Sequence, residues 1–503
     1  MNKWLVALTV IIPTFIEVVD TSVVNVSLDH IRGSLSAGVD EATWTITSYL
    51  VSNAIIIPIS GWLGRVFGRK RYLMFSVVLF TVSSFFCGLA WSLPSLIVFR
   101  IFQGIGGGAL QPISQSILLE TFPVAKHGIA MAIFGVGIMF APVVGPIMGG
   151  WITDNWSWRW IFYINIPIGI LSVLLIYLNI KDPPYLERIK RRIDYWGLIL
   201  IALGLGCLQI VLDKGQQDDW FNSAFIVRLS LVAIIALTIF VFVELRSKEP
   251  VVNLRIFKNI GFTAGNIIMF FSFFVLFGSI VLLPIFCQKM MGYTSFLAGL
   301  VLAPGGIATL FAMPLAGRFV TKINPKWILI TGMLINAYST VLLSNLSTSV
   351  DFHIIAWARI VMGAGMGFAF IVLTNLTLSS VRKEEMNNAT GIYNLLRNLG
   401  GSFGVAFVTT MLARRAQFHQ SRLSETLHPL SLKYQMALNK IMHSTGATKE
   451  AAQGIIYQDL LRQATMFSFN DTFFMCTLIL LAIIPLTGFL KRIDYSSANI
   501  SGH

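Results

Sequence analysis

Residues Thr14–Ser27 read TFIEVVDTSVVNVS and place two carboxylic acids, Glu17 and Asp20, inside an otherwise apolar segment. That segment runs from about Trp4 to Leu28, which is long enough to cross a bilayer as one helix. On a helix the two acids share one face, because they lie three residues apart. An acid near the middle of a bilayer is costly unless it faces a polar cavity, pairs with a cation or holds a proton.

The residues alone leave two roles open for Glu17 and Asp20. One role is structural, with the acid neutralised by an arginine on another helix. The other is a proton or substrate site, which is the usual role of an ionisable residue inside a membrane. We favour the second role and expect the rest of the chain to expose this site to one side of the membrane and then to the other.

The composition indicates a membrane protein with many spans. Of the 503 residues, 55% are hydrophobic and only 12% are charged, which is more apolar than a soluble domain of this size requires. The net charge of +14 comes from basic residues in short loops between the apolar runs. Anionic membrane lipids explain this charge better than nucleic acid, so we expect no nucleic-acid partner.

No metal, cofactor or enzymatic site is expected. The four cysteines stand alone within apolar runs, and the seven histidines have no metal-ligand spacing. The sequence contains neither a G-x-x-x-x-G-K-[ST] phosphate loop nor an H-E-x-x-H pair. It therefore argues against an ATP-driven pump and against a zinc protease.

Runs of about 20 apolar residues predict an all-α polytopic protein with fourteen transmembrane helices. They lie at about 5–28, 44–64, 73–93, 95–117, 127–150, 159–180, 195–213, 225–245, 261–285, 296–317, 327–346, 353–378, 389–411 and 468–490.

Every second loop between these spans collects positive charge. The loops on the side of the N-terminus hold 22 basic residues: Lys3, Arg65, Arg69, Lys70, Arg71, Lys126, Lys181, Arg188, Lys190, Arg191, Arg192, Arg246, Lys248, Arg255, Lys258, Arg318, Lys322, Lys326, Arg382, Lys383, Lys491 and Arg492. The short loops opposite hold only Arg32, Arg159, Lys214 and Lys289. By the positive-inside rule, both termini are expected to be cytoplasmic.

Two features interrupt the even spacing of the spans. The outer loop 412–467 is long and polar, and its segments LKYQMALNKIM and EAAQGIIYQDLLRQATMF have a helical period, which predicts an amphipathic helical hairpin. The spans 195–213 and 225–245 are poor in polar residues. We expect these two spans to be peripheral helices rather than walls of a cavity.

An internal repeat divides the chain. IPISGWLGRVFGRKRYL, from Ile57, resembles MPLAGRFVTKINPKWIL, from Met313, and RIFQGIGGG at Arg100–Gly108 resembles RIVMGAGMG at Arg359–Gly367. The offsets are 256 and 259 residues. We therefore expect a six-helix half over 1–180, a linker with two inserted helices over 181–259, a second six-helix half over 260–490 and a tail over 491–503. Two such halves with a site at their interface are typical of an alternating-access carrier.

Several motifs together carry a resemblance to the major facilitator superfamily, and within it to the fourteen-span drug:proton antiporter branch. VDTSVVNVSL at Val19–Leu28 resembles the first-helix motif of that branch, with Asp20 in the acidic position. RIFQGIGGGALQPISQ at Arg100–Gln115 resembles the fourth-helix motif, whose arginine is associated with proton coupling. GPIMGG at Gly145–Gly150 resembles the antiporter signature of the fifth helix.

The loop GWLGRVFGRKR at Gly61–Arg71 resembles the superfamily motif between the second and third helices. It departs at Arg65, where many members carry aspartate, so a conformational latch built on that acid is in doubt. From these motifs we expect conformational roles for Gly61, Gly68, Arg69, Gly145, Pro146, Gly149 and Gly150.

The resemblance also implies location and partners. It is closest to exporters of the bacterial inner membrane that work with a periplasmic membrane-fusion adaptor and an outer-membrane channel. The extended loop 412–467 fits such a docking role, and a lid or a solvated insertion is the alternative.

Similar depths in the membrane make a direct or water-bridged pair of Asp20 and Arg100 feasible. Counting residues from the outer surface along the first and fourth spans puts them within ~5 Å of the same depth, at 1.5 Å rise per residue. A nearby cation favours the ionised acid, whereas desolvation favours the protonated one. Separating the two groups during a cycle would then change proton affinity. Glu17, about one turn deeper, is a proton carrier, a substrate contact or a neutral spectator.

The remaining polar residues inside spans are candidates for lining a substrate cavity: Gln103, Gln111, Asn375 and Arg397. Arg397 is the isolated charge of the thirteenth span, and a structural role is open to it as much as a functional one. The predicted function is proton-driven export of hydrophobic or amphipathic compounds. The alternatives are a dedicated exporter of a lipid, fatty acid or siderophore and, more remotely, a membrane sensor or an intramembrane enzyme.

Overall fold

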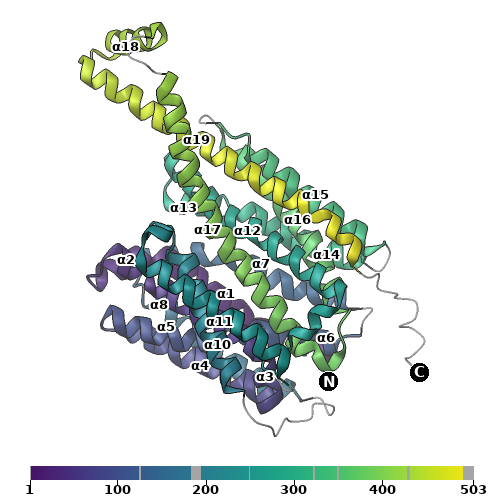
Figure 1. The fold of residues 1–503 in the computed structure, drawn as a ribbon. Coiled ribbons are helices and arrows are strands. Elements are labelled where there is room, and N and C mark those ends of the chain that lie inside the picture. Colours follow the sequence, from purple (N-terminus) through teal and green to yellow (C-terminus); the bar gives the residue numbers. More distant parts are fainter. Residues whose placement is uncertain are drawn as a thin grey trace.

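The computed structural model describes residues 2–123, 126–182, 194–247, 250–320, 323–347, 350–426 and 431–490, and all regular elements over these ranges are helices (Figure 1). Helices α1 to α9 form the first part of the bundle: Lys3–Ser34, Val39–Ala42, Trp44–Phe67, Arg69–Leu89, Leu93–Gly107, Leu110–Thr121, His127–Asn155, Trp160–Tyr163 and Asn165–Asn179. The next two, α10 and α11, cover Tyr195–Lys214 and Ala224–Arg246.

The last part of the bundle contains α12 to α19: Ile260–Met291, Ser295–Leu300, Ala303–Phe319, Pro325–Leu343, Phe352–Leu378, Met386–Thr426, Leu432–Thr445 and Lys449–Ile483. Short 3-10 helices lie at Trp220–Asn222 (η2), Leu254–Lys258 (η3), Lys383–Glu385 (η4) and Ile484–Phe489 (η5). The predicted all-α polytopic fold is therefore confirmed. Residues 183–193 of the linker, the tail 491–503, Lys248 and Lys322 lie outside the described residues.

Among the described residues, thirteen helical segments are long and apolar enough to cross a membrane. The expected span at 389–411 is not one of them; it lies within α17, where Asn394 and Arg397 lower the hydropathy. Both of these side chains are buried in the bundle. The count of fourteen stays a prediction. The expected span at 95–117 is broken into α5 and α6 by a turn at Gly108 and Ala109.

The two parts of the bundle repeat the same helix pairings. Helix α1 packs along α7 as α12 packs along α17, and α3 packs along α5 as α14 packs along α16. Glycines make the equivalent approaches: a Cβ on Gly104 would lie 2.6 Å from Tyr49 O, and one on Gly363 would lie 1.9 Å from Gly305 O. The packing thus follows the internal repeat in the sequence, while the exact limits of the halves stay a prediction.

The halves meet through α7 against α14 and through α3 against α17. Their closest approaches lie at the end of the bundle where the N-terminus lies, which we call the termini end (Figure 1). There a Cβ on Gly61 would lie 2.7 Å from Asn387 O, and one on Gly128 would lie 3.0 Å from Gly317 O. No side chain fits between these backbones, so the structure is closed between the halves at the termini end.

Helices α10 and α11 lie at the periphery, as the sequence predicts. Helix α11 has the least buried membrane-length segment, at 22%, and packs against α10. Helix α10 itself contacts both halves, because Gln209 Nε2 donates to Ser402 Oγ of α17 at 3.0 Å and Thr47 Oγ1 of α3 donates to Asp213. The inserted pair therefore bridges α3 and α17 from outside.

The loop 412–467 forms a helical hairpin, as expected, although its helices are longer than the sequence suggested. Helix α17 continues for 41 residues to Thr426, and α19 begins at Lys449, so both extend past their expected spans. With α18 they project beyond the rest of the bundle, opposite the termini end (Figure 1). Asp471 of α19 ties the two long helices together, accepting from Arg415 Nε at 2.6 Å and lying 2.8 Å from His419 Nε2.

Candidate functional site

Asp20 lies in a closed polar cluster within the first half. Its Oδ2 accepts from Arg100 Nη1 at 2.6 Å, and its Oδ1 accepts from Gln103 Nε2 at 3.0 Å and from Asn165 Nδ2 at 2.6 Å. Three helices, α5, α9 and α1, thus meet at one carboxylate. Asp20 and Arg100 are 1% and 0% exposed, so the pair is screened from solvent and its attraction is strong.

Arg100 is held on every side. Its Nε donates to Thr45 O at 3.1 Å, and its guanidinium lies 4.2 Å from the ring centroid of Tyr49. A cation over a buried aromatic face is further stabilised by the ring quadrupole. The structure therefore places Asp20 and Arg100 in direct contact, one of the two arrangements that the counting of residues made feasible.

Glu17 lies one turn away, in a second polar cluster that is also buried. Its Oε1 accepts from Tyr49 Oη at 3.0 Å and from Asn53 Nδ2 at 3.1 Å, and its Oε2 accepts from Gln111 Nε2 at 2.7 Å. Gln111 in turn accepts a hydrogen bond from Arg397 Nη2 of the second half. Tyr49 contacts both clusters, because its hydroxyl reaches Glu17 while its ring covers Arg100.

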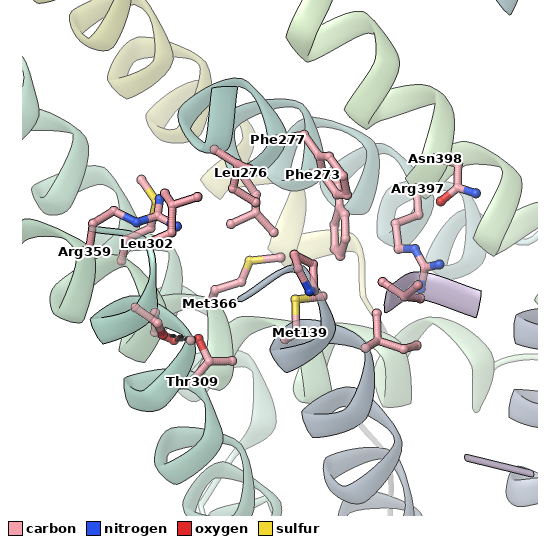
Figure 2. Close-up of a pocket in the computed structure, with 18 of the residues that line it drawn as sticks. Met139, Phe273, Leu276, Phe277, Leu302, Thr309, Arg359, Met366, Arg397 and Asn398 are labelled. Atoms are coloured by element: carbon pink, nitrogen blue, oxygen red, sulfur yellow. Dashed lines mark hydrogen bonds between the residues drawn. The ribbon is translucent and has the colours of Figure 1, made fainter. Parts of the chain in front are cut away.

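A cavity lies between the two halves, beside Gln111. It is lined by Val18, Gln111, Ile138, Met139, Pro142, Phe273, Leu276, Phe277, Ile280, Leu302, Gly305, Gly306, Thr309, Arg359, Met362, Gly363, Met366, Arg397 and Asn398. The lining is apolar except for a few convergent polar groups, which is typical of a small-molecule site. Figure 2 shows Arg359 and Arg397 on opposite sides, with Phe273, Leu276 and Met366 between them.

The four cavity candidates from the sequence separate into two groups. Gln111 and Arg397 line the cavity, whereas Gln103 belongs to the Asp20 cluster. Asn375 on α16 is buried near Gly128 at the interface between the halves and is not part of the lining. Its side-chain amide has no hydrogen-bond partner among the described residues.

Sequence reasoning missed several members of the site. Asn165 binds Asp20, while Tyr49 and Asn53 bind Glu17. A single polar residue in an apolar run, such as Asn165 in FYINIPIG, was a usable signal. Arg359 was recognised as a repeat position only, and the structure places it in the cavity wall.

The glycines of α7 bring it against α1, the helix that carries both acids. A Cβ on Gly145 would lie 2.4 Å from Ser22 Cβ, and one on Gly149 would lie 2.9 Å from Val23 Cγ1. Gly150 is less constrained, with Val26 Cγ1 at 4.0 Å. Helix α7 remains one continuous helix through Pro146.

The loop motif closes the termini end. Gly68 has φ +86°, a left-handed conformation that favours glycine, and it separates α3 from α4. The next residue, Arg69, is buried and forms an ion pair with Glu120 of α6.

Over the described residues, no group of three or more His, Cys, Asp or Glu is placed to hold a metal ion.

Comparisons with known proteins agree with this architecture. The family model described as Major Facilitator Superfamily matches residues 10–405. The chain is 37% identical to the multidrug export protein EmrB of Escherichia coli (strain K12) over 479 residues, covering 95% of this chain and 93% of that protein. It is 36% identical to the fatty acid resistance protein FarB of Neisseria gonorrhoeae over 486 residues, covering 97% and 96%.

Among solved structures, the proton:xylose symporter XylE superposes with a TM-score of 0.61 at 15% identity, covering 96% of both chains. That likeness concerns the fold alone. Two halves with repeated helix pairings, a cavity between them and a family match over most of the length lead to one conclusion. The chain belongs to the Major Facilitator Superfamily.

Proposed function

We propose that this protein is a proton-driven exporter of hydrophobic or amphipathic compounds that works by alternating access. The observation that carries the proposal is the buried Asp20–Arg100 pair beside a largely apolar cavity between the halves. The export of drugs by EmrB supports the same direction of transport. We propose further that the protein lies in the bacterial inner membrane with both termini cytoplasmic, as the distribution of basic residues in its loops indicates.

The chemistry of coupling follows from the two clusters. An ionised Asp20 is stabilised by Arg100 and by two amide donors, Gln103 and Asn165. Proton transfer to the Asp20 carboxylate removes its charge and with it the attraction that holds Arg100. Movement of α5 relative to α1 then becomes easier. The cavity can then open at the end of the bundle opposite the one to which it was open before.

The proton gradient supplies the energy for transport, and the proposed mechanism uses no cofactor. One elementary charge that moves down a membrane potential releases about 2.3 kcal/mol per 100 mV. One or two protons per cycle are therefore enough for a useful concentration ratio of the exported compound. The role is that of a carrier, not an enzyme.

The hairpin of α17, α18 and α19 has a separate role in the proposal. A carrier has no need of helices beyond the membrane, whereas a tripartite system needs a docking surface for its adaptor. We therefore assign the hairpin to a periplasmic membrane-fusion adaptor that connects to an outer-membrane channel. Membrane lipids cover the remaining apolar surface.

The direct test is proton flux on purified protein in liposomes that contain the pH indicator pyranine. Addition of a substrate panel that includes ethidium, glycocholate and decanol should produce a pH change that depends on the protein. The change should be abolished by a protonophore and be absent from protein-free liposomes. No proton flux with any compound, from protein that is folded and inserted, would contradict the proposed antiport.

A further inference from the structure

The second half repeats the arginine cluster of the first half without its acid. Arg359 on α16 stands 259 residues after Arg100, and Ser279 on α12 stands the same distance after Asp20. The contact is also repeated, because Arg359 Nη1 donates to Ser279 Oγ at 3.1 Å where Arg100 Nη1 donates to Asp20 Oδ2 at 2.6 Å. A hydroxyl thus takes the place of a carboxylate beside a buried guanidinium.

The other positions around the Arg359 guanidinium also lack the side chains that surround Arg100 in the first half. Met362 stands where the first half has Gln103, and its sulfur is 3.1 Å from the guanidinium Nη1. Gly305 stands 256 residues after Tyr49, the offset that also relates α3 to α14 at Pro58 and Pro314. The aromatic ring that covers the first guanidinium therefore has no counterpart in the second half, and Gly305 lines the cavity instead.

Arg359 is consequently a buried cation without a counter-charge among the described residues. It is 5% exposed and lines the cavity, and its Nε has no hydrogen-bond partner among the described residues. None of the described residues that line the cavity is an aspartate or a glutamate. A buried guanidinium is strongly destabilising without an anion, so the site is suited to an anion that arrives with a ligand.

The second arginine of the cavity differs from Arg359. Arg397 donates to Gln111, which is bound to Glu17, and its guanidinium lies 5.5 Å from the Phe273 ring centroid. Its Nη1, like Nε of Arg359, has no hydrogen-bond partner among the described residues, but through Gln111 it is already part of the network around an acid. Arg359, across the cavity from it in Figure 2, is the cation that remains for a ligand.

We propose that the cavity binds amphiphiles that carry a single carboxylate, and that Arg359 binds this carboxylate where the first half has Asp20. A carboxylate suits the site because one guanidinium edge can receive its two oxygens side by side. The apolar part of the ligand lies against Phe273, Leu276 and Met366. This inference rests on the proposed export function and names the substrate class of that cavity.

The test is binding of three ligands with the same chain length to the full protein in nanodiscs. Decanoate, decanol and decyltrimethylammonium are titrated by calorimetry, with empty nanodiscs subtracted. Decanoate should bind at least about ten-fold more tightly than decanol to the wild-type protein. Ser279→Asp, which rebuilds the acid of the first half, should remove this preference, and Arg359→Gln should do the same. Both variants should weaken the binding of decanoate far more than the binding of decanol.

Ser424→Asp is the matched control, because it adds the same charge at an exposed site on the hairpin; it should keep the wild-type preference. Arg359→Lys should retain part of it, which separates charge from shape. Monodisperse elution shows that each variant is folded. If Ser279→Asp aggregates, the result for Arg359→Gln alone decides the test. Equal binding of decanoate and decanol, or a preference that survives both variants, overturns the inference. Proton flux with ethidium would still uphold the export function in that case, whereas the loss of binding and flux for every compound would overturn both.

Discussion

Gln111 of α6 accepts a hydrogen bond from Arg397 of α17, so a polar contact crosses from one half of the bundle to the other. The same amide donates to Glu17 Oε2 at 2.7 Å. One side chain therefore connects an acid of the first half with a cation of the second half, beside the cavity that Gln111 and Arg397 line. We expect this contact to depend on the state of the transport cycle, because α6 and α17 belong to halves that move relative to each other.

Replacing Gln111 with leucine should destabilise the protein and slow transport. The variant keeps the size of the side chain but removes the donor to Glu17 and the acceptor for Arg397. Glu17 and Arg397 are both buried. The loss of partners for buried polar groups costs about 1–3 kcal/mol. Thermal unfolding in detergent and proton flux in liposomes measure the two effects.

The matched control is Gln209→Leu on the peripheral helix α10, whose amide binds Ser402. This variant should also lower stability, since it removes a buried hydrogen bond, but it should retain proton flux. An equal loss of flux in both variants would show that general destabilisation, and not the contact between halves near Glu17, explains the result.

Gly149→Ala should impair transport more than Gly150→Ala. A Cβ on Gly149 lies within 3.2 Å of three atoms of Val23 on α1, two of them backbone atoms, whereas Gly150 has one neighbour at 4.0 Å. The first substitution must push α1 away from α7, and α1 carries both acids. Rates of substrate-induced proton flux, normalised to inserted protein, should show the difference. Equal rates would mean that the close approach of α1 and α7 is dispensable.

Removal of the hairpin should abolish adaptor binding and leave the carrier active. Residues 420–460, the projecting part of the hairpin, include none of the residues that line the cavity. A variant in which a short Gly-Ser linker replaces residues 420–460 should lose pull-down of the adaptor expressed with it. Proton flux in adaptor-free liposomes should persist. Undiminished pull-down would contradict the docking role, and loss of flux would favour a lid.

The sequence predicted the architecture because its signals are local. Apolar runs set the spans, the alternation of Lys and Arg set the expected topology, and two repeated segments related the halves. The hairpin was predicted from helical periodicity, although the continuation of α17 as one helix to Thr426 was not. The first helix-breaking residue after the span is Pro429, so nothing in the sequence ends the helix at the membrane boundary.

The candidate site could be predicted only where two residues had the same depth. Asp20 and Arg100 met that condition, and the structure places them in contact. The partners of Glu17 and Arg397 depended on how helices rotate about their axes, which a single sequence does not reveal. Asn375 illustrates the limit, because a polar residue in a span can face the interface at the termini end as well as a cavity.

The central claim is that Asp20 takes up the proton that drives export. The most direct measurement compares Asp20→Asn with wild type in liposomes, using the compound of the panel that gives the largest proton flux. Asparagine keeps the size and hydrogen bonding of the side chain but cannot titrate. We expect Asp20→Asn still to exchange labelled for unlabelled substrate but not to accumulate it under a pH gradient, while Glu17→Gln retains gradient-driven accumulation. Gradient-driven accumulation by Asp20→Asn, with its loss in Glu17→Gln, would contradict the account and move the proton site to Glu17.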